Sequence, residues 1–99
     1  MPIIRFNQID LYYETSGQGA PLLLIHGLGS SVRDWENQLP FFARSYQVFA
    51  LDLRGHGNSE KPPGPYSSVL FAKDVAGFIR SLDIAPVHVV GLSLGGFIA

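Results

Sequence analysis

The sequence contains no cysteine among its 99 residues. A disulfide framework and a metal site built on thiolates are therefore excluded. An excess of charge of one sign is also lacking, because seven Lys and Arg stand against eight Asp and Glu. This balance excludes the basic footprint of a nucleic-acid-binding protein and a polybasic membrane patch. We expect no nucleic acid and no membrane as partner.

Long apolar runs are absent too. The longest, such as residues 22–25, have the length of a strand and are too short to span a bilayer. Residues 1–6 lack the charged segment and long apolar stretch of a signal peptide. We therefore expect a soluble, cytoplasmic protein.

Charged residues are scarce, at 15% against 46% hydrophobic residues. A globular domain carries about a quarter charged residues, so this composition is typical of sheet and core with part of the polar cover missing. The sequence ends in the apolar segment 95–99, with no cation after Arg80 to mark the end of a helix. We expect a chain cut inside a secondary-structure element.

Two kinds of strand are predicted. Residues 3–6 and 9–13 alternate apolar with polar side chains, as antiparallel strands with one wet face do. Residues 22–25, 48–51 and 87–90 are almost continuously apolar, which indicates strands buried on both faces of a parallel sheet covered by helices.

Two helices are predicted between these buried strands. Ser31 and Asp34 resemble a capping box, and Pro40 would end or kink the helix that they open. Its apolar face would be Val32, Trp35 and Leu39. The second helix has one apolar stripe, with Lys73, Asp74 and Arg80 off it. The stripe comprises Phe71, Val75, Phe78, Ile79 and Leu82. Strand and helix alternate throughout, which predicts one α/β architecture.

The segment Gly91-Leu92-Ser93-Leu94-Gly95 directly follows the last predicted strand. It is a G-x-S-x-G motif, in which a sharp turn between strand and helix raises the serine hydroxyl above the sheet. Side chains at Gly91 and Gly95 would collide with the neighbouring strand and helix. The helix that begins after the serine directs N–H groups toward developing negative charge. Ser93 is the predicted nucleophile.

A second glycine-rich turn, His26-Gly27-Leu28-Gly29, ends the strand of residues 22–25. A tetrahedral oxyanion needs two N–H donors, one from the residue after the nucleophile and one from a loop of this kind. The predicted donors are the backbone N–H groups of Leu94 and Leu28. We expect His26 and Gly27, together with Gly91 and Gly95, to support the two loops.

Taken in order, four segments resemble the α/β-hydrolase family. They are Leu24-Ile25-His26-Gly27-Leu28-Gly29, Trp35, Asp52-Leu53-Arg54-Gly55-His56-Gly57-Asn58-Ser59 and Gly91-Leu92-Ser93-Leu94-Gly95-Gly96. The resemblance implies the α/β-hydrolase fold, a mostly parallel sheet of eight strands. Residues 1–99 would be the N-terminal portion of a single domain, incomplete at the C-terminus, and would supply the first five strands. The resemblance implies Ser93 as nucleophile, with the backbone of Leu28 and Leu94 as oxyanion hole and no metal or organic cofactor.

In this family the catalytic acid and histidine follow the nucleophile, and no acid or histidine follows Ser93. The triad of residues 1–99 is therefore incomplete. His26 is expected to brace its loop by hydrogen bonds, His56 to orient the floor of the site, and His88 to be a buried histidine of the core or an interface. Asp52 is expected to fix its own loop by accepting backbone N–H groups. None of them replaces the missing base.

A serine nucleophile forms an acyl-enzyme, which favours a small molecule as the partner, with a carboxylic ester or lactone as substrate. Family members that open epoxides or remove halides need a carboxylate at this position. Residues 24–59 also resemble enol-lactonases and meta-cleavage-product hydrolases, so hydrolysis of a C–C bond in a ring-cleavage product is an alternative. Another is a non-enzymatic ligand-binding protein on the same fold. A dinucleotide-binding loop is disfavoured, because it would need a third glycine or an alanine at the position that Val32 occupies.

Residues 1–99 expressed alone are predicted to be aggregated or molten. Residues 87–90 would form an uncapped apolar edge, and the helix after Ser93 would stop after about one turn. Each wet apolar side chain forfeits about 1.5–3 kcal/mol, against a domain stability of about 5–15 kcal/mol. A soluble monomer with a cooperative thermal transition would contradict this prediction.

The same polypeptide is predicted not to hydrolyse a simple aryl ester above a serine-free control. Turnover that depends on both Ser93 and one of the three histidines would show that the triad is complete.

Overall fold

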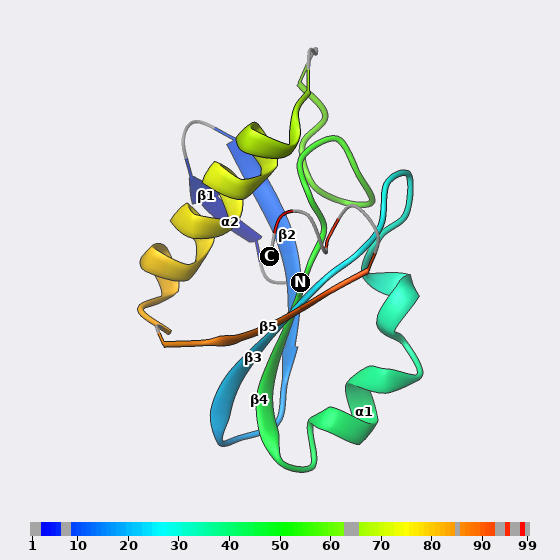
Figure 1. Ribbon diagram of the computed structural model, residues 1–99, viewed down its shortest axis with the longest axis vertical. Coiled ribbons are helices and arrows are strands. Elements are labelled where there is room, and N and C mark those ends of the chain that lie inside the picture. Colours follow the sequence, from blue (N-terminus) through cyan, green and yellow to red (C-terminus); the bar gives the residue numbers. More distant parts are fainter. Residues whose placement is uncertain are drawn as a thin grey trace.

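Five strands form one mixed sheet in the order β1-β2-β4-β3-β5 (Figure 1). The computed structural model describes residues 3–6, 9–62, 66–84, 86–92, 95 and 98. The strands are β1 (Ile3–Phe6), β2 (Ile9–Ser16), β3 (Ala20–Ile25), β4 (Tyr46–Leu51) and β5 (His88–Gly91). β1 pairs with β2, and β2 with β4, in antiparallel fashion, whereas β3 runs parallel to both β4 and β5. All five predicted strands are confirmed.

β3 and β4 are buried on both faces, as their continuous apolar sequences predict. Successive side chains of a strand point to opposite faces, so Leu23 and Ile25 enter one core and Leu22 and Leu24 the other. The same alternation divides the residues of β4: Phe49 and Leu51 belong to the first core, Val48 and Ala50 to the second.

Helix α2 (Ser68–Leu82) covers the first core, on the opposite side of the sheet from α1 (Figure 1). It begins where the Ser67 hydroxyl caps the helix by accepting a hydrogen bond from the Leu70 N–H at 3.1 Å. It ends at Asp83, whose φ of 53° is a left-handed conformation that aspartate adopts more readily than most residues. The predicted apolar stripe faces the sheet.

The predicted helix around Val32 is two helices, which corrects the sequence-based expectation. The 3₁₀ helix η1 (Val32–Trp35) is followed by the short α-helix α1 (Gln38–Phe42). One continuous helix would need a hydrogen bond from the nitrogen of Pro40 to the carbonyl of Glu36, and proline has no N–H to give. In α1 the proline lies in the first turn, where no intrahelical donor is required.

The predicted capping box is also wrong. The Ser31 hydroxyl accepts a hydrogen bond from the Arg33 N–H at 3.2 Å instead of from the Asp34 N–H. The Asp34 carboxylate turns away from the helix and accepts hydrogen bonds from the loop that precedes it.

Asp74 was expected off the apolar stripe of α2 and is instead 1% exposed. Its carboxylate pairs in a bidentate manner with the guanidinium of Arg54, at 2.5 Å from Nε and 2.9 Å from Nη2. Position 74 lies three residues after Phe71 and four before Phe78, so helical spacing itself places Asp74 on the buried side. The carboxylate raises the pKa of Arg54 above its ordinary value.

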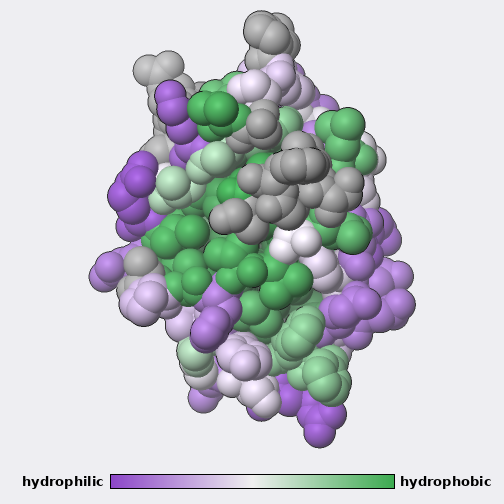
Figure 2. Space-filling view, in the orientation of Figure 1, coloured by the Kyte–Doolittle hydropathy of each residue, from purple (hydrophilic) through white to green (hydrophobic). Residues whose placement is uncertain are grey.

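β5 lies at the edge of the described sheet, as predicted for residues 87–90 of this chain. Its residues alternate between exposed and partly buried, which corrects the expectation of a strand buried on both faces. His88, predicted to be buried, is exposed, and its ring lies edge-on to that of Tyr46 with centroids 6.0 Å apart. Val90 and Leu92 are 39% and 49% exposed. Figure 2 shows apolar surface gathered in the middle of the face that carries β5, with hydrophilic residues at its margins. Of the described helices, none has both the length and the apolar character needed to cross a membrane.

Replacing Asp74 by Ala should destabilise the protein by about 3–5 kcal/mol, because the buried Arg54 charge loses its partner. Asp10→Ala is the matched control, since the Arg5–Asp10 pair is exposed, with side chains 62% and 50% accessible. A loss of no more than about 1 kcal/mol is expected there. Urea unfolding of both variants measures the difference, and equal losses would show that the Arg54–Asp74 pair adds nothing beyond a surface pair.

Candidate functional site

The carboxyl ends of three parallel strands meet at one edge of the sheet. Ile25, at the end of β3, is in register with Leu51 on β4 and with Gly91 on β5. The loops that follow these strands therefore start side by side, and those after β3 and β4 extend beyond the same end of the sheet in Figure 1. Ligand sites of open α/β sheets lie at this edge.

The elbow after β5 is anchored to the end of β3. The Leu92 N–H donates to the Ile25 carbonyl at 3.1 Å, and the Gly95 N–H donates to the Leu92 carbonyl at 2.9 Å. A Cβ at position 95 would lie 2.3 Å from the Ile25 oxygen, so no side chain fits there. Ser93 and Leu94, the predicted nucleophile and first oxyanion donor, lie outside the described residues and stay predictions.

The loop after β3 turns back within four residues. The Ser30 N–H donates to the Gly27 carbonyl at 3.2 Å, and Gly29 has a φ of +75°, a left-handed conformation that favours glycine. The Gly27 N–H donates to the Asp34 carboxylate at 3.2 Å. Among the described residues no acceptor takes the Leu28 N–H, and the Leu28 side chain is 74% exposed. The loop thus presents Leu28 to the surface at the edge where the elbow begins.

His26 is fully buried and engaged at both ring nitrogens. Its Nε2 accepts a hydrogen bond from the Leu53 N–H at 3.0 Å, and its Nδ1 lies 2.7 Å from the Gly27 carbonyl oxygen. The two bonds together assign the neutral ring with its proton on Nδ1. Burial lowers the pKa of His26 below its ordinary value of 6.5. His26 thus joins the loops after β3 and β4. Because its one ring lone pair already accepts the Leu53 N–H, none is left to accept a proton as a base.

Asp52 holds the loop after β4, as its position in the sequence predicts. It is 1% exposed, and its two carboxylate oxygens accept hydrogen bonds from the N–H groups of Val32 and Asn58, each with a nitrogen-to-oxygen distance of 2.8 Å. A Cβ at Gly57, where φ is +51°, would lie 2.2 Å from the Asp52 Oδ2, so the loop needs glycine to wind around the carboxylate. Asp52 is a structural anchor of both loops.

His56 and the Arg54–Asp74 pair complete the floor of this edge. The His56 Nδ1 lies 2.9 Å from the Arg54 carbonyl oxygen, and the rings of His56 and His26 are 5.0 Å apart. Arg54 was not among the site residues predicted from the sequence, although its place two residues after Asp52 and the helical spacing that buries position 74 are both visible there. Within the described part of the chain, no group of three or more His, Asp or Glu could hold a metal ion.

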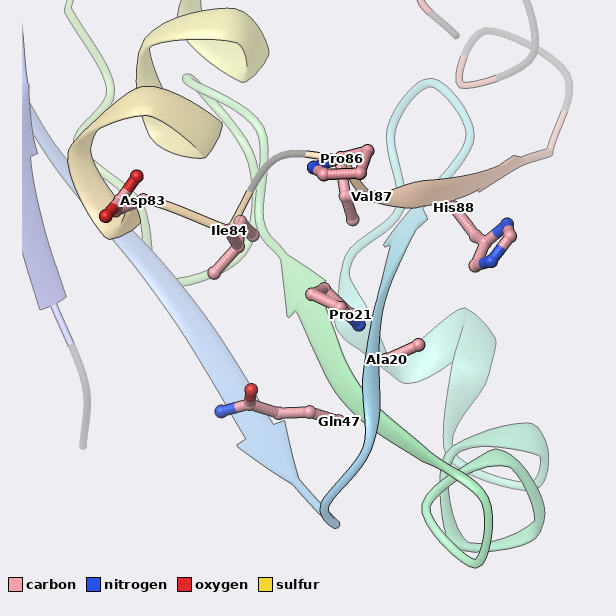
Figure 3. Close-up of a pocket in the computed structure, with 8 residues that line it drawn as sticks. All are labelled: Ala20, Pro21, Gln47, Asp83, Ile84, Pro86, Val87 and His88. Atoms are coloured by element: carbon pink, nitrogen blue, oxygen red, sulfur yellow. The ribbon is translucent and has the colours of Figure 1, made fainter.

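A cavity of about 630 Å³ lies at the opposite edge of the sheet, among the first residues of β3, β4 and β5 (Figure 3). The carboxylate of Asp83 and the imidazole of His88 lie on opposite sides of it and do not converge (Figure 3). The described residues that line the cavity therefore offer no converging set of groups for catalysis. It is lined by Ala20, Pro21, Gln47, Asp83, Ile84, Pro86, Val87 and His88.

The buried His26 predicts a loss of stability on acidification. The folded protein keeps His26 neutral, whereas the unfolded chain takes up a proton as the pH falls below about 6.5. The contribution is fully present above that pH and is lost below it, by at most about 1.4 kcal/mol per pH unit. Urea unfolding between pH 7.5 and 5 should give a shallower loss for His26→Gln than for the wild type. His88→Gln, which changes an exposed ring, should keep the wild-type slope; equal slopes in all three proteins would contradict the assignment.

Known proteins resemble this chain over nearly its whole length. Residues 20–99 match the family model described as alpha/beta hydrolase fold. A soluble epoxide hydrolase of Corynebacterium sp. is 39% identical over 93 residues, covering 94% of this chain and 32% of the relative. The putative non-heme bromoperoxidase BpoC of Mycobacterium tuberculosis is 41% identical over 93 residues, covering 92% of this chain and 35% of the relative. The solved enol-lactonase of Burkholderia xenovorans superposes with a TM-score of 0.93 at 33% identity, covering 98% of this chain and 39% of that structure.

The chain spans about a third of the length of the curated relatives that it matches. The family model covers its three parallel strands, both loops of the candidate site and the elbow. The fold class expected from the sequence is confirmed: the chain belongs to the alpha/beta hydrolase fold family.

Proposed function

We propose that the complete protein is a serine hydrolase that cleaves a carboxylic ester or a lactone through an acyl-enzyme. The observation that carries the proposal is the packing of the elbow against β3. The backbone of Gly95 approaches the Ile25 carbonyl so closely that only glycine fits. This contact brings the segment on either side of Ser93 to the edge where the loop of Leu28 begins.

The chemistry of the proposal follows from the residue types. The Ser93 hydroxyl attacks the acyl carbon and gives its proton to the catalytic histidine of the complete protein, and the carbonyl oxygen becomes an oxyanion that accepts hydrogen bonds from the N–H groups of Leu28 and Leu94. As the intermediate collapses, that proton passes to the leaving oxygen, so that the alcohol departs, or the lactone ring opens, and the acyl group stays on Ser93. Water then hydrolyses the acyl-enzyme. The catalytic acid and histidine would come from the two thirds of the relatives' length that these 99 residues do not span.

Overall similarity does not choose the reaction, because the relatives are named as a lactonase, an epoxide hydrolase and a bromoperoxidase. The residue at the elbow supports the choice. Position 93 is a serine, and a serine oxygen attacking a carbonyl gives an ester that water can hydrolyse.

Replacing Ser93 by Ala should lower kcat by about 10⁴- to 10⁶-fold, because the covalent step is lost while binding and the oxyanion donors remain. The variant should unfold at the same urea concentration as the wild type. A serine-directed phosphonate should label the wild type at Ser93, as read by mass spectrometry of the digested protein.

Ser81→Ala is the matched control for this test, since Ser81 is exposed on α2. It should keep full activity and full labelling. Labelling at another serine, or ester hydrolysis by the Ser93 variant at the wild-type rate, would sink the proposal.

A further inference from the structure

We infer that Asp34 is a positioning residue that sets the direction of the Leu28 N–H, the second donor of the proposed oxyanion hole. The inference rests on the proposed function and adds to it a residue with no expected part in the reaction. Asp34 is half-buried, and its two carboxylate oxygens reach two different residues of the turn after β3.

One carboxylate holds both ends of the turn. The Asp34 Oδ2 accepts the Gly27 N–H at 3.2 Å, and its Oδ1 accepts the Ser30 hydroxyl at 2.5 Å. Leu28 and Gly29 lie between these two anchors. A hydrogen bond from the Ser30 N–H to the Gly27 carbonyl, at 3.2 Å, closes the turn. The carboxylate therefore restrains the turn from outside while the backbone closes it from inside.

The peptide group between Gly27 and Leu28 is the part that matters for catalysis. Its carbonyl oxygen lies 3.2 Å from the Ser30 nitrogen and 2.7 Å from the His26 Nδ1. In a planar trans peptide the C=O and the N–H point in opposite directions. Fixing the Gly27 carbonyl on two donors thus fixes the direction of the Leu28 N–H, and Asp34 holds in place the serine that supplies one of those donors.

Asp34 also decides which N–H of the turn is available. Adjacent amides at Gly27 and Leu28 could both serve as donors to an anion at this edge. The carboxylate takes the Gly27 N–H, and no acceptor among the described residues takes the Leu28 N–H. Of the two adjacent N–H groups, only that of Leu28 is therefore left to bind an oxyanion, and the turn also fixes its direction.

A carboxylate near an oxyanion has an opposing effect, because its negative charge disfavours the charge that develops on the substrate oxygen. The positioning role predicts that geometry outweighs charge. Asn at position 34 retains one acceptor for the Gly27 N–H, and its amide group can donate to the Ser30 hydroxyl. Ala retains neither bond. The two variants separate the hydrogen bonds of Asp34 from its charge.

The test uses the complete protein, an aryl ester and the matching thionoester. Asp34→Ala should lower kcat/KM for the oxygen ester by about 10- to 100-fold, mostly in kcat, since a misplacement of about 1 Å costs up to about 10²-fold. The thionoester, whose sulfur accepts hydrogen bonds weakly, should slow much less, so the oxygen-to-sulfur rate ratio falls. Asp34→Asn should stay within about threefold of the wild type in both the rate and the ratio.

Glu36→Ala is the matched control, because it removes an exposed carboxylate two residues away that makes no side-chain hydrogen bond among the described residues. It should leave the ratio unchanged. Leu28→Pro removes the donor itself and should give the full 10²- to 10³-fold loss expected for one oxyanion donor. If Asp34→Ala does not fold, Asp34→Ser takes its place, since its hydroxyl is too short to reach the Gly27 N–H.

Phosphonate labelling at Ser93 distinguishes the two ways of failing. If Ser93 is labelled and the oxygen-to-sulfur ratio of Asp34→Ala equals that of the wild type, the positioning role is overturned and the proposed function stands. If Asp34→Asn falls as far as Asp34→Ala, the charge of Asp34 and not its geometry is responsible, and the inference is likewise overturned. If Ser93 is not labelled in the wild type, the proposed function itself has failed.

Discussion

The carbonyl group of Ile25 is the point on which this edge of the molecule is built. It is the last carbonyl of β3, the strand between β4 and β5; it accepts a hydrogen bond from the Leu92 N–H at 3.1 Å, and a Cβ at Gly95 would come within 2.3 Å of it. The backbone on both sides of position 93, at Leu92 and at Gly95, thus contacts one oxygen atom. The next residue, His26, opens the loop that carries Leu28, so the distance between the elbow and that loop depends on one strand end and not on the packing of mobile side chains.

The loops at this edge have left the sheet, so their backbone N–H groups need acceptors that strands no longer provide. Three side chains supply them across the chain: His26 for Leu53, Asp52 for Val32 and Asp34 for Gly27. Two of these hydrogen bonds, His26 with Leu53 and Asp52 with Val32, join the segment after β3 to the loop after β4. These two loops therefore hold each other in place. A net of this kind is rigid because every buried bond that breaks leaves a group unpaired, at a cost of about 1–3 kcal/mol.

Local patterns predicted those parts of the fold that local interactions decide. The continuous apolar sequences of β3 and β4 indicated burial on both faces, and the glycine two residues after Ser93 indicated a close approach of backbone to backbone, which is seen between Gly95 and the Ile25 carbonyl. Asp34 was misjudged because a capping box and a loop brace use the same residue at the same spacing. Only the distance to Gly27, seven positions back in the chain, distinguishes the two.

Asp74 and His88 show that burial is hard to predict from sequence when it depends on a partner elsewhere in the fold. Helical spacing places position 74 on the buried side of α2, but a carboxylate stays buried there only with a partner, and its partner Arg54 lies 20 positions away in a loop. The exposure of His88 depends on which strands pair with β5. Among the described strands β5 pairs only with β3, and every second side chain of β5, His88 included, is exposed. Neither partner can be found from a pattern within one element, because pairing across the fold is decided by topology.

The residues that hold this edge together act on the backbone of its loops. His26, Asp34 and Asp52 accept backbone N–H groups, and Gly95 provides space. These contacts involve backbone groups and empty space, so they set no requirement on which side chain stands at position 93. Proteins named as a lactonase, an epoxide hydrolase and a bromoperoxidase resemble this chain over the same region, at 33%, 39% and 41% identity. The proposed reaction therefore rests on the type of residue at position 93 and not on overall similarity.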